Sequence, residues 1–189
     1  VAAIEEHRPD IVGFSAFLTT TMPMFKANIN ALEKAGLRDQ VIVMVGDGSY
    51  LMLNSEIATS VMLGCKLIVV VLDNRGYGCI QRLQLASGSP RFNNLLEDCG
   101  APPAIDFAAH AASLGAQAVH VKDIAALKSA MRAARAAATT QVIVIDTTPW
   151  RTTDDGGAWW EVAIPEVSPR AEVRAAREQY EQAKRKQQP

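Results

Sequence analysis

The spacing of apolar residues predicts alternating strands and helices along most of the chain. Residues 41–45 and 67–72 are two short apolar runs, mostly β-branched, typical of strands buried on both faces. Between them, apolar residues recur at helical spacing over residues 50–64, and Gly64 suits the end of a helix. This order predicts a βαβ unit with two parallel strands.

The rest of the chain continues the same alternation. Further strands are predicted at residues 10–17, 118–121 and 142–146, and helices at residues 22–35, 107–114 and 124–138. Residues 173–186 are either a solvated helix or a frayed end. Such alternation indicates a mainly parallel sheet with helices on both faces. We therefore predict a three-layer α/β/α, doubly wound fold. It forms a single α/β domain over residues 1–170, followed by a C-terminal helix or tail at residues 171–189.

One segment, residues 75–105, contains four glycines and three prolines and is longer than a compact domain normally leaves without structure. It is either a functional loop or a segment that is disordered without its partner, and the sequence leaves both interpretations open.

Composition narrows the classes of protein. The 189 residues are 49% hydrophobic and 21% charged, with a net charge of −1, which suffices for one sizeable core. This balance gives no basic patch for nucleic acid, and no apolar run has the length of a membrane span. The three cysteines have no metal-ligand spacing, and an odd number favours a reducing compartment, the cytoplasm.

Polar residues follow both strands of the βαβ unit. The run Gly46-Asp47-Gly48-Ser49 follows the first strand, and Asp73-Asn74 follows the second. Parallel strands end at the same edge of a sheet, and glycines let backbone amides approach a phosphate closely. An Asp carboxylate, the Asn74 amide oxygen and the carbonyl of Gly76 are oxygen ligands that suit Mg²⁺. The pattern predicts a site for a diphosphate and a metal ion.

In order and separation, these two motifs resemble the cofactor-binding motif of the thiamine-diphosphate-dependent enzymes. Asp73 is a departure, because that family usually has two consecutive Asn there. The segments 46–56, 72–80, 106–111, 142–147 and 156–167 are similar to one branch of the family, which hydrolyses a carbon–carbon bond of a cyclic diketone in inositol catabolism. The resemblance covers roughly residues 41–182.

The resemblance implies thiamine diphosphate and Mg²⁺ as cofactors and a small cyclitol-derived substrate. The cofactor-binding residues would be Gly46, Asp47, Gly48, Ser49, Asn74, Gly76, Tyr77 and Gly78, and the metal ligands Asp47, Asn74 and the carbonyl of Gly76. No residue is assigned a catalytic role. The family uses a glutamate on a separate pyrimidine-binding domain, usually across a subunit interface, so we expect a homo-oligomer and no turnover from this chain alone.

The first 46 residues suggest another origin. Residues 9–23 and the following stretch to Gly46 resemble the flavodoxin-like, cobalamin-binding domain of the corrinoid proteins of methylamine and methanol metabolism. The cobalt-ligating motif of that family is absent. A recombinant joined at Gly46 is one hypothesis; it could be catalytically inert, and a corrinoid-binding fragment is the lower alternative.

Other candidate residues carry weaker signals. His110 lies in an Ala-rich helix and His120 near a strand end, and for both a packed or exposed position is favoured over a catalytic role. Trp159 and Trp160 could line a sugar-like pocket, but packing of the tail is favoured.

Overall fold

The computed structural model describes residues 31, 34–35, 42–151 and 163–186. The strand predicted at residues 10–17 and all but the last turn of the helix predicted at 22–35 lie outside them. In that last turn, the backbone N–H of Ala35 donates to the carbonyl of Ala31 at 3.1 Å. The chain divides into two compact units, residues 1–73 with 105–147 and residues 74–104 with 148–189. The single domain predicted over residues 1–170 stays a prediction.

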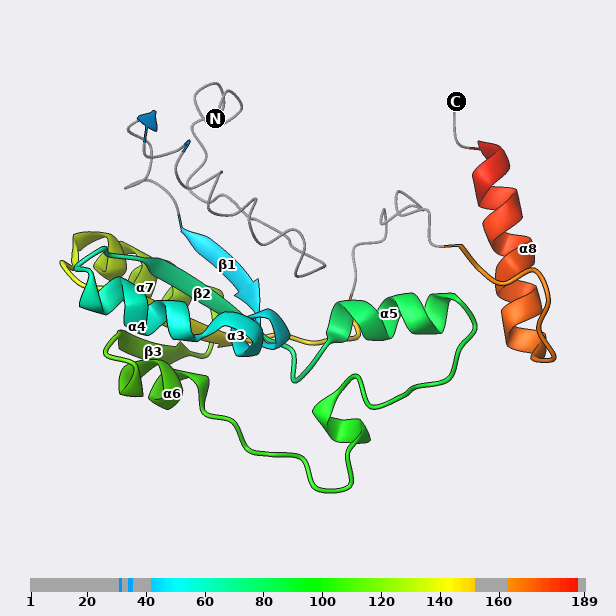
Figure 1. Ribbon diagram of the computed structural model, residues 1–189, viewed down its shortest axis with the longest axis horizontal. Helices are drawn as coiled ribbons and strands as arrows, with labels where there is room; N and C mark the ends of the chain where they lie inside the picture. Colours follow the sequence, from blue (N-terminus) through cyan, green and yellow to red (C-terminus); the bar gives the residue numbers. More distant parts are fainter. Residues whose placement is uncertain (1–30, 32–33, 36–41, 152–162, 187–189) are drawn as a thin grey trace. The chain divides into compact units, whose positions relative to one another are not determined.

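The first unit is built on a parallel sheet (Figure 1). Its strands are β1 (Val43–Gly46), β2 (Ile68–Asp73), β3 (Gln117–Val121) and β4 (Gln141–Asp146), in the order β1-β2-β4-β3. Each neighbouring pair is parallel. The four strands predicted within the described residues are therefore confirmed, with ends that differ by at most two residues.

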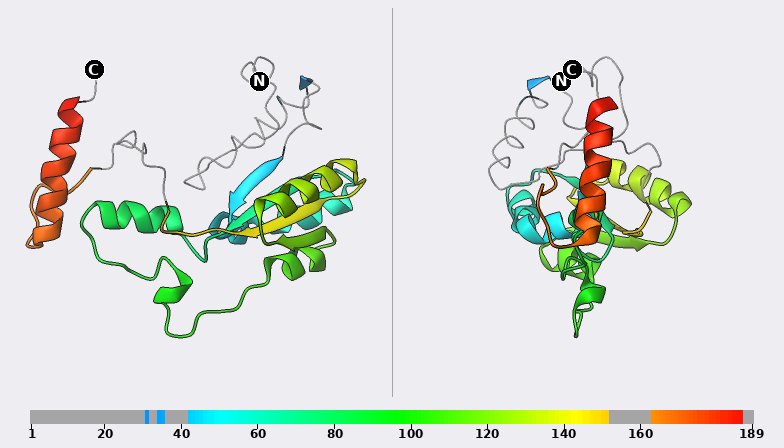
Figure 2. Two further views of the ribbon diagram at one scale, coloured as in Figure 1. Left: turned by 180° about the vertical axis from the view of Figure 1, so that it is seen from behind. Right: turned by 90° about the vertical axis from the view of Figure 1, so that its right-hand side faces the viewer.

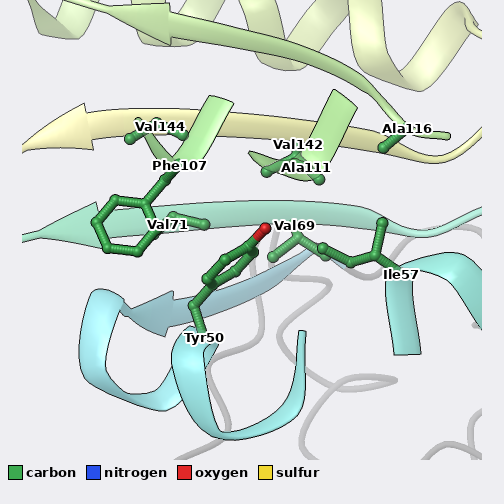
Figure 3. Close-up of a cluster of buried hydrophobic side chains, with 9 residues drawn as sticks. All are labelled: Tyr50, Ile57, Val69, Val71, Phe107, Ala111, Ala116, Val142 and Val144. Carbon is green, nitrogen blue, oxygen red and sulfur yellow. The ribbon is translucent and has the colours of Figure 1, made fainter. Parts of the chain in front are cut away.

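Helices cover both faces of this sheet. Successive residues of β2 and β4 alternate between two buried clusters, as side chains of a strand must. Val69 and Val71 pack with α3 (Asp47–Leu53), α4 (Ser55–Met62) and α6 (Phe107–Ser113), as Figure 3 shows. On the other face, Val70 and Ile143 pack with α7 (Ile124–Ala136). In the left-hand view of Figure 2, which is seen from behind, α7 lies in front of the sheet. The predicted three-layer α/β/α fold is confirmed.

The helix predicted over residues 50–64 is instead two helices, α3 and α4, separated at Asn54. The Asn54 side chain donates to the Leu51 backbone carbonyl at 3.2 Å. The backbone carbonyl of Asn54 accepts from the N–H of Ile57, three residues on, at 3.1 Å. Asn favours such local bonds over a continuous helix. α3 also begins earlier than predicted, at Asp47.

The second unit contains α5 (Gly78–Ala86), the short 3₁₀ helix η3 (Leu96–Asp98) and α8 (Ala171–Lys186). The long segment predicted as a loop at residues 75–105 thus contains two helices. Of the two alternatives left open for residues 173–186, a helix or a frayed end, the structure has the helix α8, whose Val173 and Ala176 are buried with Ile164. None of the described helices is long and apolar enough to cross a membrane.

Candidate functional site

The first half of the predicted site lies at the carboxyl end of the sheet. β1 ends at Gly46, whose register partner is Leu72, and Asp73 is paired with Asp146 at the ends of β2 and β4. Asp47 follows β1 directly, begins α3 and is only 2% exposed. Open α/β sheets bind ligands beyond the carboxyl ends of their strands, so the place of Asp47 directly after β1 suits a metal ligand.

The helix that carries Asp47 is held in place through Tyr50. Its hydroxyl lies 2.8 Å from Nδ1 of His110, and its ring packs edge-on against Phe107 with centroids 5.4 Å apart (Figure 3). Burial raises the pKa of Tyr50, so the phenol stays neutral. His110 thus has a packing role on α6, which agrees with the interpretation favoured from the sequence.

The remaining residues of the first motif differ in exposure. Gly48 is buried, whereas Ser49 is exposed in the first turn of α3. Gly46 stands at the N-terminal end of α3 in an extended conformation. These residues, Gly46, Asp47, Gly48 and Ser49, all belong to the first unit.

The second half of the predicted site is the segment from Asn74 to Gly78 in the second unit. Arg75 has φ +64° and Gly76 has φ +139°, so the chain turns sharply there. The turn is followed by an antiparallel bridge between Gly76 and Leu95. Tyr77 donates its N–H to the Asn94 carbonyl at 2.7 Å, and Leu96 donates to the Arg75 carbonyl at 2.8 Å.

Two glycines make room in this segment. A Cβ on Gly76 would lie 2.4 Å from the carbonyl oxygen of Asn94. A Cβ on Gly78 would lie 2.7 Å from Nδ2 and 3.1 Å from Oδ1 of Asn74. The Asn74 amide therefore rests against the first residue of α5, in space that any side chain at position 78 would occupy.

The chemistry of the predicted ligands suits a hard divalent cation. They are one carboxylate, one amide oxygen and one backbone carbonyl, all oxygen ligands of the kind that Mg²⁺ accepts. Within the described part of the chain, no group of three or more His, Cys, Asp or Glu side chains could hold a metal ion. The predicted ligands, with a single acidic side chain, are not a group of that type.

Sequence reasoning missed two features. His120 is hydrogen-bonded to Asp146, with Nε2 and Oδ1 2.9 Å apart, and both side chains are about half exposed. Such surface pairs contribute about 1 kcal/mol or less. Asn94, which contacts the second motif, lies in a loop without any sequence pattern that would single it out. For His120 and Asp146, the only signal in the sequence was a polar residue near the end of each apolar strand.

A parallel α/β sheet with a Gly-Asp-Gly sequence where one strand passes into a helix, and Asp-Asn at the end of the next strand, defines a class of cofactor-binding domain. Residues 20–147 match the family described as thiamine pyrophosphate enzyme, C-terminal TPP binding domain, and the chain belongs to this family. Thiamine pyrophosphate is another name for thiamine diphosphate, so the expected cofactor is that of the family.

Among individual proteins, the chain is 37% identical over 147 residues to the 3D-(3,5/4)-trihydroxycyclohexane-1,2-dione hydrolases of Bacillus cereus (strain AH820) and Bacillus anthracis (strain A0248). The aligned part is 74% of this chain and 23% of each hydrolase. The chain therefore spans about a quarter of the length of these relatives.

Two solved structures share the fold. Benzoylformate decarboxylase from Polynucleobacter necessarius has a TM-score of 0.55 and 28% identity, over 64% of this chain and 22% of its own. A thiamine diphosphate-dependent 4-hydroxybenzoylformate decarboxylase from Rhodococcus jostii RHA1 has a TM-score of 0.52 and 22% identity, over 57% of this chain and 20% of its own. The second likeness concerns the fold alone.

The family match bears on the hypothesis of a recombinant chain. It begins at residue 20 and runs across Gly46 without interruption. Residues 20–46 thus belong to the same family match as the motif that follows them, and a junction at Gly46 has no support from it.

Proposed function

We propose that this chain is the diphosphate-binding module of a thiamine-diphosphate-dependent hydrolase that cleaves a carbon–carbon bond of a cyclic diketone derived from a cyclitol. The observation that carries the proposal is the identity to the trihydroxycyclohexane-dione hydrolases over 74% of the chain. Both motifs of the predicted site lie within the family match.

In this proposal, Asp47, Asn74 and the Gly76 carbonyl hold Mg²⁺, and Gly46, Gly48, Ser49, Tyr77 and Gly78 surround the diphosphate. The glycines at 76 and 78 support this assignment, because a Cβ at either position would clash with its neighbours. When bound, the cofactor supplies the carbanion chemistry. The residues of this chain anchor the charged end of the cofactor and orient it, and no residue of the chain is proposed to transfer a proton.

Turnover and assembly are further parts of the proposal. We expect this chain alone to bind cofactor without turnover, since none of its residues is assigned a role in proton transfer. We also expect self-association, because large apolar side chains are exposed on α3 and at the end of α4: Leu51, Met52, Leu53, Met62 and Leu63. Sedimentation of the purified chain over a range of concentrations measures this self-association.

The three cysteines, which form no disulfide, support the cytoplasm as the compartment of the protein.

Titration calorimetry with thiamine diphosphate and Mg²⁺ tests the binding proposal. Binding should also raise the free energy of unfolding by about 2.7 kcal/mol at a cofactor concentration of about 100 Kd. Asp47→Ala should abolish both effects. Asp146→Asn is the control, because Asp146 ends β4 of the same sheet, yet it is exposed and lies outside the motif.

The outcome decides between two functions. A well-folded chain that shows no heat and no thermal shift at millimolar cofactor would refute the binding proposal and favour a catalytically inert fold. Retention of binding by Asp47→Ala would refute the assignment of this residue as a metal ligand.

A further inference from the structure

We propose that Asn94 is a positioning residue that orients the Gly76 carbonyl toward the bound cation. The inference rests on the proposed function, because the carbonyl of Gly76 is one of the proposed metal ligands. It adds a residue outside both sequence motifs, on the opposite side of the turn that follows Asn74. All the contacts that carry it lie within the second unit.

The backbone of Asn94 controls the direction of the carbonyl. The C=O of Gly76 and the N–H of Tyr77 belong to one planar, trans peptide group, so they point in opposite directions. The Tyr77 N–H donates to the Asn94 carbonyl at 2.7 Å, which turns the Gly76 carbonyl away from residue 94. The same hydrogen bond polarises the peptide group and makes its oxygen a better ligand.

The bridge fixes the next peptide group as well. Leu96 donates its N–H to the Arg75 carbonyl at 2.8 Å, and Leu95, between the two bonds, is 1% exposed. The close approach depends on the absence of a side chain at Gly76, where a Cβ would lie 2.9 Å from Cα of Leu95. The segment 94–96 thus holds the turn 75–77 from one side.

The side chain of Asn94 attaches this segment to α5. Its Nδ2 donates to Oε1 of Gln81 at 3.1 Å and also to Oε1 of Gln84. Gln81 is fully buried, and its Nε2 has no hydrogen-bond partner among the described residues. Without Asn94, both ends of this buried amide would lack a partner, which is costly enough to shift the local structure. Asn94 therefore connects α5 to the turn that carries the proposed ligand.

A comparison of the affinities for Mg²⁺ and Ca²⁺ tests the positioning role of Asn94. Mg²⁺ requires near-ideal octahedral geometry, whereas Ca²⁺ accepts longer and more variable ligand arrangements. A carbonyl that is free to turn should therefore weaken Mg²⁺ more than Ca²⁺. A purely structural loss would weaken both ions alike or unfold the unit.

The experiment compares the wild-type chain with Asn94→Ala by calorimetry, titrating Mg²⁺ or Ca²⁺ at a fixed concentration of thiamine diphosphate. We expect Asn94→Ala to weaken Mg²⁺ about tenfold and Ca²⁺ about twofold or less. Asn93→Gly is the matched control: Asn93 is the exposed neighbour with φ +52°, which glycine adopts readily, and both affinities should stay unchanged. Gln84→Ala, which removes one acceptor, should shift the ratio in the same direction by a smaller factor.

Hydrogen exchange gives a readout without metal. The amide protons of Tyr77 and Leu96 should exchange slowly in the wild-type chain and faster in Asn94→Ala. An unchanged Mg²⁺/Ca²⁺ ratio in a folded Asn94→Ala, or unprotected Tyr77 and Leu96 amides in the wild-type chain, would overturn the inference while leaving the proposed function intact. A wild-type chain that binds cofactor with neither metal would refute both.

Discussion

Replacing Gly78 by alanine should weaken metal binding while leaving the fold intact. A Cβ at this position would lie 2.7 Å from Nδ2, 3.0 Å from Cγ and 3.1 Å from Oδ1 of Asn74. The amide must therefore move away from the start of α5. Since it is the end of a flexible side chain, it can do so by rotation, and the backbone need not follow.

In Gly78→Ala, the two main contributions to the free energy of unfolding nearly cancel. Alanine in place of glycine in a helix contributes about 1 kcal/mol of stability. Turning the Asn74 side chain away from its preferred rotamer costs about 0.5–1.5 kcal/mol. The free energy of unfolding should therefore change by less than about 1 kcal/mol, whereas loss of a correctly placed ligand should weaken Mg²⁺ binding roughly 10- to 100-fold.

Calorimetry with Mg²⁺ and thiamine diphosphate measures the affinity, and urea unfolding measures the stability. Gly76→Ala is the contrasting variant, because its Cβ would meet a backbone oxygen at 2.4 Å at φ +139°. Its strain of about 1–3 kcal/mol should appear as lost stability as well as lost binding. A Gly78→Ala chain that binds Mg²⁺ as the wild-type chain does would refute the role of Asn74 as a ligand in this arrangement.

Two further predictions concern the first unit. Ile143→Ala should lower the free energy of unfolding by about 2–5 kcal/mol, since Ile143 is 1% exposed, whereas Met62→Ala at 84% exposure should change it by less than about 0.5 kcal/mol; urea unfolding separates the two. Tyr50→Phe should cost about 1 kcal/mol through the lost contact with His110. Because the pKa of Tyr50 is raised above 10.0 in the folded state, the Tyr50 hydroxyl contributes fully to the free energy of unfolding below that pH. This contribution declines as the pH rises further. Unfolding curves on both sides of pH 10.0 should show a steeper loss for the wild-type chain than for Tyr50→Phe; equal slopes would contradict this.

The apolar pattern predicted the centre of the sheet well because β2 and β4 are buried on both faces, whereas the edge strand β3 is mostly exposed and buries only Val121. In β2 and β4, nearly every residue meets a helix layer, so the sequence there is a continuous apolar run. The same reasoning failed at Asn54, whose side chain donates to the backbone carbonyl of Leu51 where the predicted helix divides in two. Periodicity cannot detect such a local hydrogen bond, because the apolar positions on both sides keep their spacing.

The order and chemistry of the candidate site also followed from the sequence. The polar residues after β1 and β2 are visible because they interrupt apolar runs, and parallel strands end at one edge of a sheet. No sequence pattern indicated Asn94, since its contacts with Tyr77, Gln81 and Gln84 join residues that no short motif relates.

By itself, the sequence determined the four strands of the described sheet, the class of fold and the two motifs, because burial and turn chemistry act on residues that are close along the chain. Only the tertiary structure decided that Tyr50 is held by His110 and that the turn at Gly76 is bridged by Leu95. These contacts depend on long-range packing, which places residues together only after the chain has folded. Such packing determines how firmly the proposed ligands are held.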